Sequence, residues 1–251
     1  MLKFFRNIRQ NLLSENKFSK YLVYAVGEIL LVVIGILVAL QINQWKQEQD
    51  LKQLEKTYLK RLLIDLDHDV TNIEAAIADI DENQSIIKSF ISSFNNASNI
   101  DSLQKSMTAF FENGWLIFEF VPSRNTYIDL SQTGNMKVIT NTSLVNDIIS
   151  YYGYITQVEE SNNVNKNWIT PIDQAVAKET PAFEIDPSTS DLFINNDKSI
   201  AIKNLFANKD LLSRDAAGHY WINRSLKDNL IAIKGLTLDL QESIKSDLNK
   251  Q

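Results

Sequence analysis

The fold of this chain is decided by YLVYAVGEILLVVIGILVAL (Tyr21–Leu40), whose only charged side chain is Glu28. Twenty residues at a helical rise of about 1.5 Å span about 30 Å, which is the thickness of the hydrocarbon core of a bilayer. The stretch therefore predicts a transmembrane helix over residues 21–42, with the lipid bilayer as its partner.

Two alternatives to a transmembrane helix are a buried core helix and a cleaved signal peptide. A core helix would need amphipathic neighbours on every side. A signal peptide has a shorter apolar region followed by small residues of the A-x-A type, and no such residues follow Leu40. Aromatic rings favour the headgroup region, so we expect Tyr21 and Tyr24 at one end and Trp45 at the other to anchor the helix.

Charged residues are distributed unevenly along the chain. Residues 1–20 carry five basic side chains against one acidic, whereas residues 46–251 carry 20 basic against 29 acidic. Because basic residues beside a first membrane helix are retained in the cytoplasm, we expect a cytoplasmic N-terminus and an exported C-terminal part. The acidic balance of the large part argues against nucleic-acid binding, because it would repel phosphates.

Residues 1–20 are predicted to form a basic amphipathic head. Its apolar side chains recur at helical spacing, at Leu2, Phe5, Ile8 and Leu12, and most of its basic and amide side chains fall on the other side. This pattern predicts an interfacial helix on anionic lipid, and the alternative is a solvated basic flank.

Six positions of the membrane segment and its end fall on one helix face, and all but one are small or polar: Ala25, Glu28, Val32, Gly35, Ala39 and Asn43. Gly35 and Ala39 form a step that allows two helix backbones to approach closely, and Glu28 is disfavoured against lipid. We therefore expect Ala25, Glu28, Gly35 and Ala39 to form a helix–helix interface, in self-association or with another membrane protein. In the alternative, Glu28 is hydrated near the cytoplasmic surface or protonated.

Beyond Trp45 the chain contains no glycine or proline before Gly114, and apolar residues recur in steps of three and four. This periodicity predicts a long stalk helix over residues 43–94, continuous with the membrane helix. Residues 95–251 are expected to form an exported helical domain that packs on the stalk, so the predicted fold class is all-α, with an exported helical bundle.

Turn and capping residues predict the elements that follow the stalk. A loop is expected over Asn95–Ser102, followed by a helix that Asp101 caps and that ends near Gly114. WLIFEFV (Trp115–Val121) has no obvious partner strand, so we expect an irregular buried segment that Pro122 ends.

Local signals also predict the helices of the second half of the chain. A helix is expected around Tyr127–Thr133, followed by a turn at Gly134. Further helices are expected to begin at the N-cap Asn141, at Thr170 with Pro171 in the first turn, and at the N-cap Asp197. A last long helix is expected from about Asp215.

Two stretches of the chain resemble a bacterial family of short single-pass membrane proteins of unknown function. One is GEILLVVIGILVALQINQW (27–45), followed by the pattern E-x-x-Y-L-x-x-L-x-x-D-L of residues 55–66. The other is TYIDLSQTGNMKVITNTSLVNDIISYY (Thr126–Tyr152). The resemblance implies an inner-membrane location with a periplasmic domain, and it brings no activity, cofactor or catalytic residue.

Motifs that carry chemistry are scarce. The chain has no cysteine, no H-E-x-x-H, no phosphate loop, no G-x-G-x-x-G and no G-x-S-x-G. We therefore expect no enzyme, no catalytic residue, no cofactor and no metal site. The best cation candidate is Asp65 with His68 and Asp69 on one helix face, and the alternative is an ordinary solvated acidic face. His219 is expected to be a satisfied packing residue.

Aromatic residues offer one candidate ligand pocket, with Arg124 as an anion anchor. The rings that would line it are Trp115, Tyr127, Tyr151, Tyr152, Tyr154 and Trp168. Aromatic residues at helical spacing also occur in ordinary cores, which is the alternative.

Three function classes are compatible with these features. The first is a non-enzymatic interaction or scaffold component of the cell envelope, which the membrane helix and helical domain favour. The second is a ligand-binding sensor domain, which would need a separate output partner because residues 1–20 are too few for a signalling domain. The third is an enzyme, for which the sequence offers no site.

Overall fold

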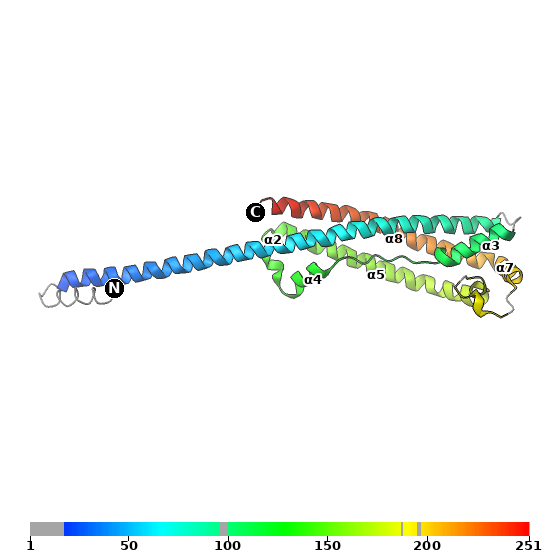
Figure 1. The fold of residues 1–251 in the computed structure, drawn as a ribbon, viewed down its shortest axis with the longest axis horizontal. Coiled ribbons are helices and arrows are strands. Elements are labelled where there is room, and N and C mark those ends of the chain that lie inside the picture. Colours follow the sequence, from blue (N-terminus) through cyan, green and yellow to red (C-terminus); the bar gives the residue numbers. More distant parts are fainter. Residues whose placement is uncertain (1–17, 96–99, 187, 195–196, 251) are drawn as a thin grey trace. The chain divides into compact units, whose positions relative to one another are not determined.

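The computed structural model describes residues 18–95, 100–186, 188–194 and 197–250 (Figure 1). All regular secondary structure in these ranges is helical, which confirms the all-α class. The chain divides into two compact units, Met1–Thr57 and Tyr58–Gln251. The predicted head lies outside the described residues, apart from its last three positions.

The first helix, α2 (Phe18–Asn95), contains both the predicted membrane segment and the predicted stalk, so their continuity is confirmed. Within the first unit, α2 is long and apolar enough to cross a membrane, with a mean hydropathy of 2.7 over its most apolar window. No residue of that window is buried inside the chain. An exposed apolar helix near the N-terminus fits a membrane anchor.

The second unit is a helical bundle in which α2 from Tyr58 onward, α5 (Thr142–Glu179) and α8 (Lys209–Leu248) are the long elements (Figure 1). Shorter helical elements connect them: α3 (Ile100–Ala109), the π-helical turn η1 (Phe110–Gly114), α4 (Asn125–Gln132), η2 (Asn135–Val138), α6 (Ala182–Ile185), η3 (Ser190–Leu192) and α7 (Lys198–Ala207).

Helical periodicity in α2 explains how the bundle is packed. Its fully buried aliphatic side chains follow one another in steps of three, four or seven residues, at Leu59, Leu62, Leu66, Ile73, Ile80 and Ile87. Most of this stripe packs against apolar side chains of α4, α5 and α8 in one core cluster. A second cluster begins at Ile87 and is rich in phenylalanine, with the Phe90 and Phe110 rings stacked at 4.1 Å between centroids.

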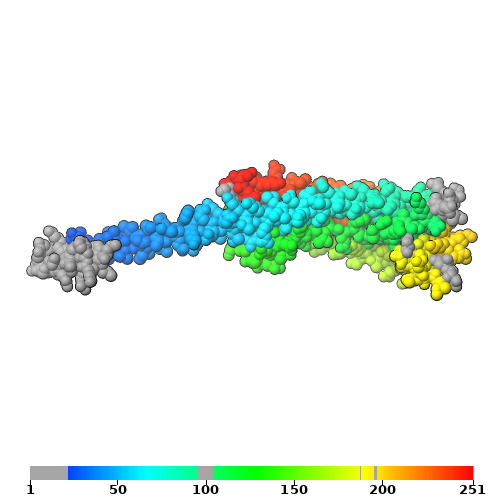
Figure 2. All heavy atoms as spheres, in the orientation of Figure 1, coloured from blue at the N-terminus to red at the C-terminus, as the bar shows by residue number. Residues whose placement is uncertain are grey.

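Helices α2 and α8 are also joined by three polar pairs, and Figure 2 shows the two helices side by side at the surface. The pairs recur every seven residues on both helices, and the numbering rises on one as it falls on the other, so the helices run antiparallel. From one end to the other the pairs are Asp67 with Gln241, Glu74 with Lys234, and Asp81 with Lys227.

Residues 116–124 form neither helix nor strand, as predicted for the segment around WLIFEFV. The expected burial is wrong, because only Phe120 of Trp115–Val121 is buried, whereas Leu116 and Val121 are exposed. Polar side chains from the long helices satisfy the backbone groups of this segment. The Asn223 amide donates to the Leu116 carbonyl at 2.8 Å and accepts from the Phe118 N–H at 3.3 Å. Asn162 of α5 donates to the Phe118 carbonyl at 3.3 Å. Side-chain amides therefore replace the partner strand that this segment lacks.

Three predicted helix boundaries are wrong. Asp101 does not cap α3, because α3 already begins at Ile100 and Asp101 lies inside it. No helix begins at Thr170 and Pro171, because Pro171 lies inside α5, which continues to Glu179. Burial of Ile169 and Val176 on either side of the proline stabilises the continuous helix and offsets the backbone hydrogen bond that proline removes. The last helix begins at Lys209 rather than near Asp215, which lies in its second turn.

Several local signals are confirmed. The Asn141 side chain caps α5 by accepting from the backbone N–H groups of Ser143 and Leu144, and Asp197 caps α7 in the same manner. Gly134 has φ = 70°, a left-handed conformation that favours glycine at the predicted turn.

Candidate functional site

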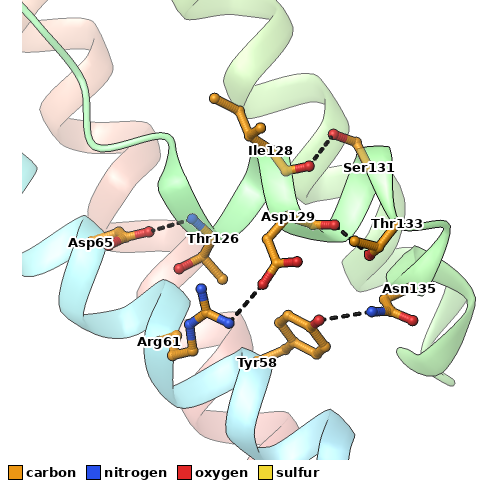
Figure 3. Close-up of polar contacts among 9 residues, drawn as sticks. All are labelled: Tyr58, Arg61, Asp65, Thr126, Ile128, Asp129, Ser131, Thr133 and Asn135. Carbon is orange, nitrogen blue, oxygen red and sulfur yellow. Dashed lines mark hydrogen bonds and ion pairs between the residues drawn. The ribbon is translucent and has the colours of Figure 1, made fainter.

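The predicted cation candidate on α2 has a structural role instead. Asp65 Oδ2 accepts from the backbone N–H of Thr126 at 3.1 Å (Figure 3). Asp69 Oδ1 accepts from the backbone N–H of Ser123 at 2.7 Å. His68 is exposed to solvent. The two carboxylates therefore hold the chain at the start of α4.

Figure 3 shows further contacts between this part of α2 and the segment around α4. Asn135 donates from its side-chain amide to the Tyr58 hydroxyl at 2.8 Å. Arg61 donates to Asp129 Oδ2 at 2.8 Å. These residues lie in the 58–66 part of the first resembling stretch and in the 126–152 stretch, so these two segments pack against each other.

A buried polar pair continues this network. The Tyr151 hydroxyl donates to Asp69 Oδ2 at 3.2 Å and lies 3.1 Å from the Thr237 hydroxyl oxygen. Burial raises the pKa of the Asp69 carboxyl above its ordinary value of 3.8, although the bonds from Ser123 and Tyr151 oppose the change. Burial likewise raises the pKa of Tyr151. Burial therefore shifts both groups toward their neutral forms relative to the free side chains.

The aromatic side chains proposed as one pocket are packed in separate places. Tyr127 stacks on Tyr152 at 4.1 Å, and Tyr151 meets the same ring edge to face at 5.0 Å, in the core. Trp168 is exposed and contacts the exposed Trp221 edge to face at 5.9 Å. Tyr127, Tyr151 and Tyr152 are therefore ordinary core residues, as the alternative to a ligand pocket held.

The remaining members of the predicted pocket are also engaged elsewhere. Trp115 contacts Phe111 edge to face at 5.5 Å. Arg124 forms an ion pair with Glu159 at 2.8 Å, so its guanidinium already has an anionic partner.

A different set of side chains converges between α5 and α8. Asp173 of α5 and Asp215 and His219 of α8 each offer a ligand atom, and these atoms lie within 4.8 Å of one another. His219 Nε2 lies 2.9 Å from Asp173 Oδ1. Asp215 has no exposed surface and His219 is 1% exposed. Among the described residues, this is where three potential metal ligands meet.

The electrostatics of this group centre on Asp215. Burial, reinforced by the neighbouring Asp173 carboxyl, raises the pKa of Asp215 to about 8. Neither of its oxygens forms a hydrogen bond of ordinary geometry, although the Asp173 carboxyl and the Trp115 indole lie near enough to influence its pKa. His219 Nδ1 has no hydrogen-bond partner. The Trp115 indole N–H, also without an acceptor, belongs to a ring whose centroid lies 6.5 Å from that of His219.

Sequence reasoning found only one member of this group. Asp215 and His219 are four residues apart, so their i, i+4 spacing on a predicted helix was a usable signal for a shared face. The predicted helix start near Asp215 obscured that signal. Asp173 has no local signal, because it reaches the site only through the antiparallel packing of α5 on α8. His219, predicted to be a satisfied packing residue, is buried but satisfied at one nitrogen only.

The four residues predicted to form an interface in the membrane segment all lie in α2. Gly35 and Ala39 are exposed, and Ala25 and Glu28 are half-buried. A Cβ added at Gly35 would meet nothing within 4 Å. Glu28 has an interaction within the chain. Tyr24 and Trp45 are exposed, as anchors require, and the side chain of Tyr21 lies outside the described part.

No protein-family model, curated protein or solved structure matches this chain. The resemblance to the family of single-pass membrane proteins therefore stays a prediction.

Proposed function

We propose that this chain is a membrane-anchored, non-enzymatic interaction or scaffold component of the cell envelope. Its N-terminus lies in the cytoplasm, its first helix spans the inner membrane, and its helical domain lies in the periplasm. The positive charge of residues 1–20 and the negative charge of residues 46–251 support this orientation.

The observation that carries the proposal is the exposure of the apolar part of α2. Its large side chains are exposed along the chain from Leu22 to Leu40, so a membrane or a second helix must cover them. Gly35 and Ala39 leave the backbone accessible on one face, which is where a partner helix packs closely.

The alternative, a sensor domain, has less support. The tyrosine rings that were candidates for its ligand pocket fill the core, and Arg124 is paired with Glu159. A scaffold needs only a membrane anchor and a folded domain that presents a surface.

Disulfide crosslinking in native membranes tests the proposal. The chain has no cysteine, so Asn43→Cys, on the predicted face, introduces a single reporter thiol. We expect a crosslinked species, formed with a second copy or with a partner, that Gly35→Leu weakens. Small residues allow two helix backbones to approach closely, and the leucine side chain would prevent that approach.

Val33→Leu is the matched control, because it adds apolar bulk on another face. Both substitutions keep the segment apolar, so membrane insertion should be unchanged. Equal crosslinking in all three proteins would reject the interface, and the scaffold proposal would lose its supporting contact.

A further inference from the structure

The group formed by Asp173, Asp215 and His219 has no part in the proposed membrane anchoring. We propose that these three side chains bind a divalent transition-metal ion of the zinc type. The site lies in the second unit, between α5 and α8.

The geometry presents ligand atoms from both helices to one point. Asp215 and His219 lie one turn apart on α8, and Asp173 faces them from α5 at 2.9 Å from the imidazole Nε2. One ligand atom from each residue lies within 4.8 Å of the other two. Zinc–ligand bonds of about 2.0–2.2 Å hold the ligand atoms of one ion within about 4.4 Å of one another, so these atoms must converge slightly to hold an ion.

The second observation is the absence of protein partners for buried polar atoms at this point. Both oxygens of Asp215 lack hydrogen-bond partners, although the residue has no exposed surface. Buried polar atoms without partners cost about 1–3 kcal/mol each. A cation would satisfy the carboxylate and would remove the repulsion between two neighbouring acidic groups.

The ligand set determines the class of ion. An imidazole nitrogen with two carboxylate oxygens suits zinc and its transition-metal neighbours, whereas calcium and magnesium prefer oxygen ligands throughout. Three protein ligands leave a fourth tetrahedral position for water. The Asp173 side chain is 30% exposed, so the ion reaches the site from that side.

Zinc binding by the full-length protein tests the site. The protein is purified in detergent without a polyhistidine tag, stripped with EDTA and titrated with Zn²⁺ in a calorimeter, with metal content measured after dialysis. We expect one Zn²⁺ per chain and a higher melting temperature with Zn²⁺ than with EDTA. Co²⁺ in place of Zn²⁺ should give visible absorption bands of tetrahedral coordination, and Mg²⁺ or Ca²⁺ should not raise the melting temperature.

Variants identify the ligands. Asp215→Asn and Asp173→Asn keep side-chain size and should weaken Zn²⁺ binding at least tenfold. His68→Ala removes the other histidine of the chain, which is exposed, and should bind as the wild type does. Thermal melting in EDTA shows whether each variant is folded. If Asp215→Asn does not fold, Zn²⁺ binding by Asp173→Asn, at a half-buried position, tests the site.

Three results would overturn the site. The wild type would bind no Zn²⁺ at micromolar concentration, or the two aspartate variants would bind it as tightly as the wild type. The third is loss of binding in His68→Ala, which would place the ion at the surface.

Discussion

Asn223 of α8 donates from its side-chain amide to Asn83 Oδ1 of α2 at 3.0 Å, and both side chains are buried. Asn83 in turn donates to the carbonyl of Asn113 at 2.6 Å. The pair joins two long helices and also binds the backbone on both sides of Trp115. The buried amide pair therefore fixes the start of the irregular segment in place.

Asn223→Ala should lower the free energy of unfolding, because it leaves the Leu116 carbonyl and the Asn83 amide with fewer partners. Each buried group left unsatisfied costs about 1–3 kcal/mol. Urea unfolding of the full-length protein in detergent measures the loss. Asn146→Ala, at an exposed position of α5, is the control. A loss no larger than that of the control would contradict the role of the pair.

Two glycines of α8 should respond to alanine in opposite directions. A Cβ at Gly218 would collide with the Cδ1 of Ile169, which is fully buried, whereas a Cβ at Gly235 meets nothing within 4 Å. Gly235→Ala should stabilise the helix by about 0.5–1 kcal/mol. Gly218→Ala should destabilise the protein by about 1–3 kcal/mol, as overpacked cores do. Thermal unfolding compares the two variants. Stabilisation by both substitutions would contradict the prediction, because it would show that the Ile169 side chain moves aside at little cost.

The buried Asp69 carboxyl should make stability depend on pH. Its folded pKa lies above the ordinary 3.8, so its favourable contribution is complete below that pH and is lost as the pH rises through the folded pKa. Asp69→Asn cannot ionise, so its stability relative to the wild type should increase between about pH 3 and pH 7. Urea unfolding at both pH values measures the difference, with exposed Asp239→Asn as control. Parallel pH profiles for Asp69→Asn and the wild type would be the contrary result.

Reporter fusions at the C-terminus should show that the C-terminal helical domain is exported. Alkaline phosphatase folds only outside the cytoplasm and green fluorescent protein only inside, so the first fusion should be active and the second dark. Reversing the charge of residues 1–20 should reduce phosphatase activity. The opposite fluorescence and activity pattern would place the helical domain in the cytoplasm.

The fragment 46–251, which includes the compact unit from Tyr58 onward, should fold by itself. Its apolar side chains are buried among its own helices in two core clusters. Circular dichroism should show mostly helix and a cooperative thermal transition. A spectrum dominated by strand, or a gradual loss of signal, would contradict this prediction.

Local signals in the sequence were sufficient for most helices and their caps. Asn141 and Asp197 cap the helices they were expected to cap, because an N-cap depends on a few neighbouring residues. Pro171 misled the prediction because burial of Ile169 and Val176, which no local window shows, keeps α5 continuous. The same continuity carries Asp173 toward α8, so an error about one proline also concealed the candidate metal site.

The polar pairs between α2 and α8 repeat every seven residues, so they do not by themselves fix the register of the two helices. Sliding α8 by two turns would bring Lys234 opposite Asp67. It would also bring Lys227 opposite Glu74, so two acid–lysine pairs would survive the slip. The charges therefore select the helix face but tolerate an alternative alignment. The buried amide pair occurs once and has no equivalent seven residues away, so it allows a single register, as a lone polar residue does in a coiled coil.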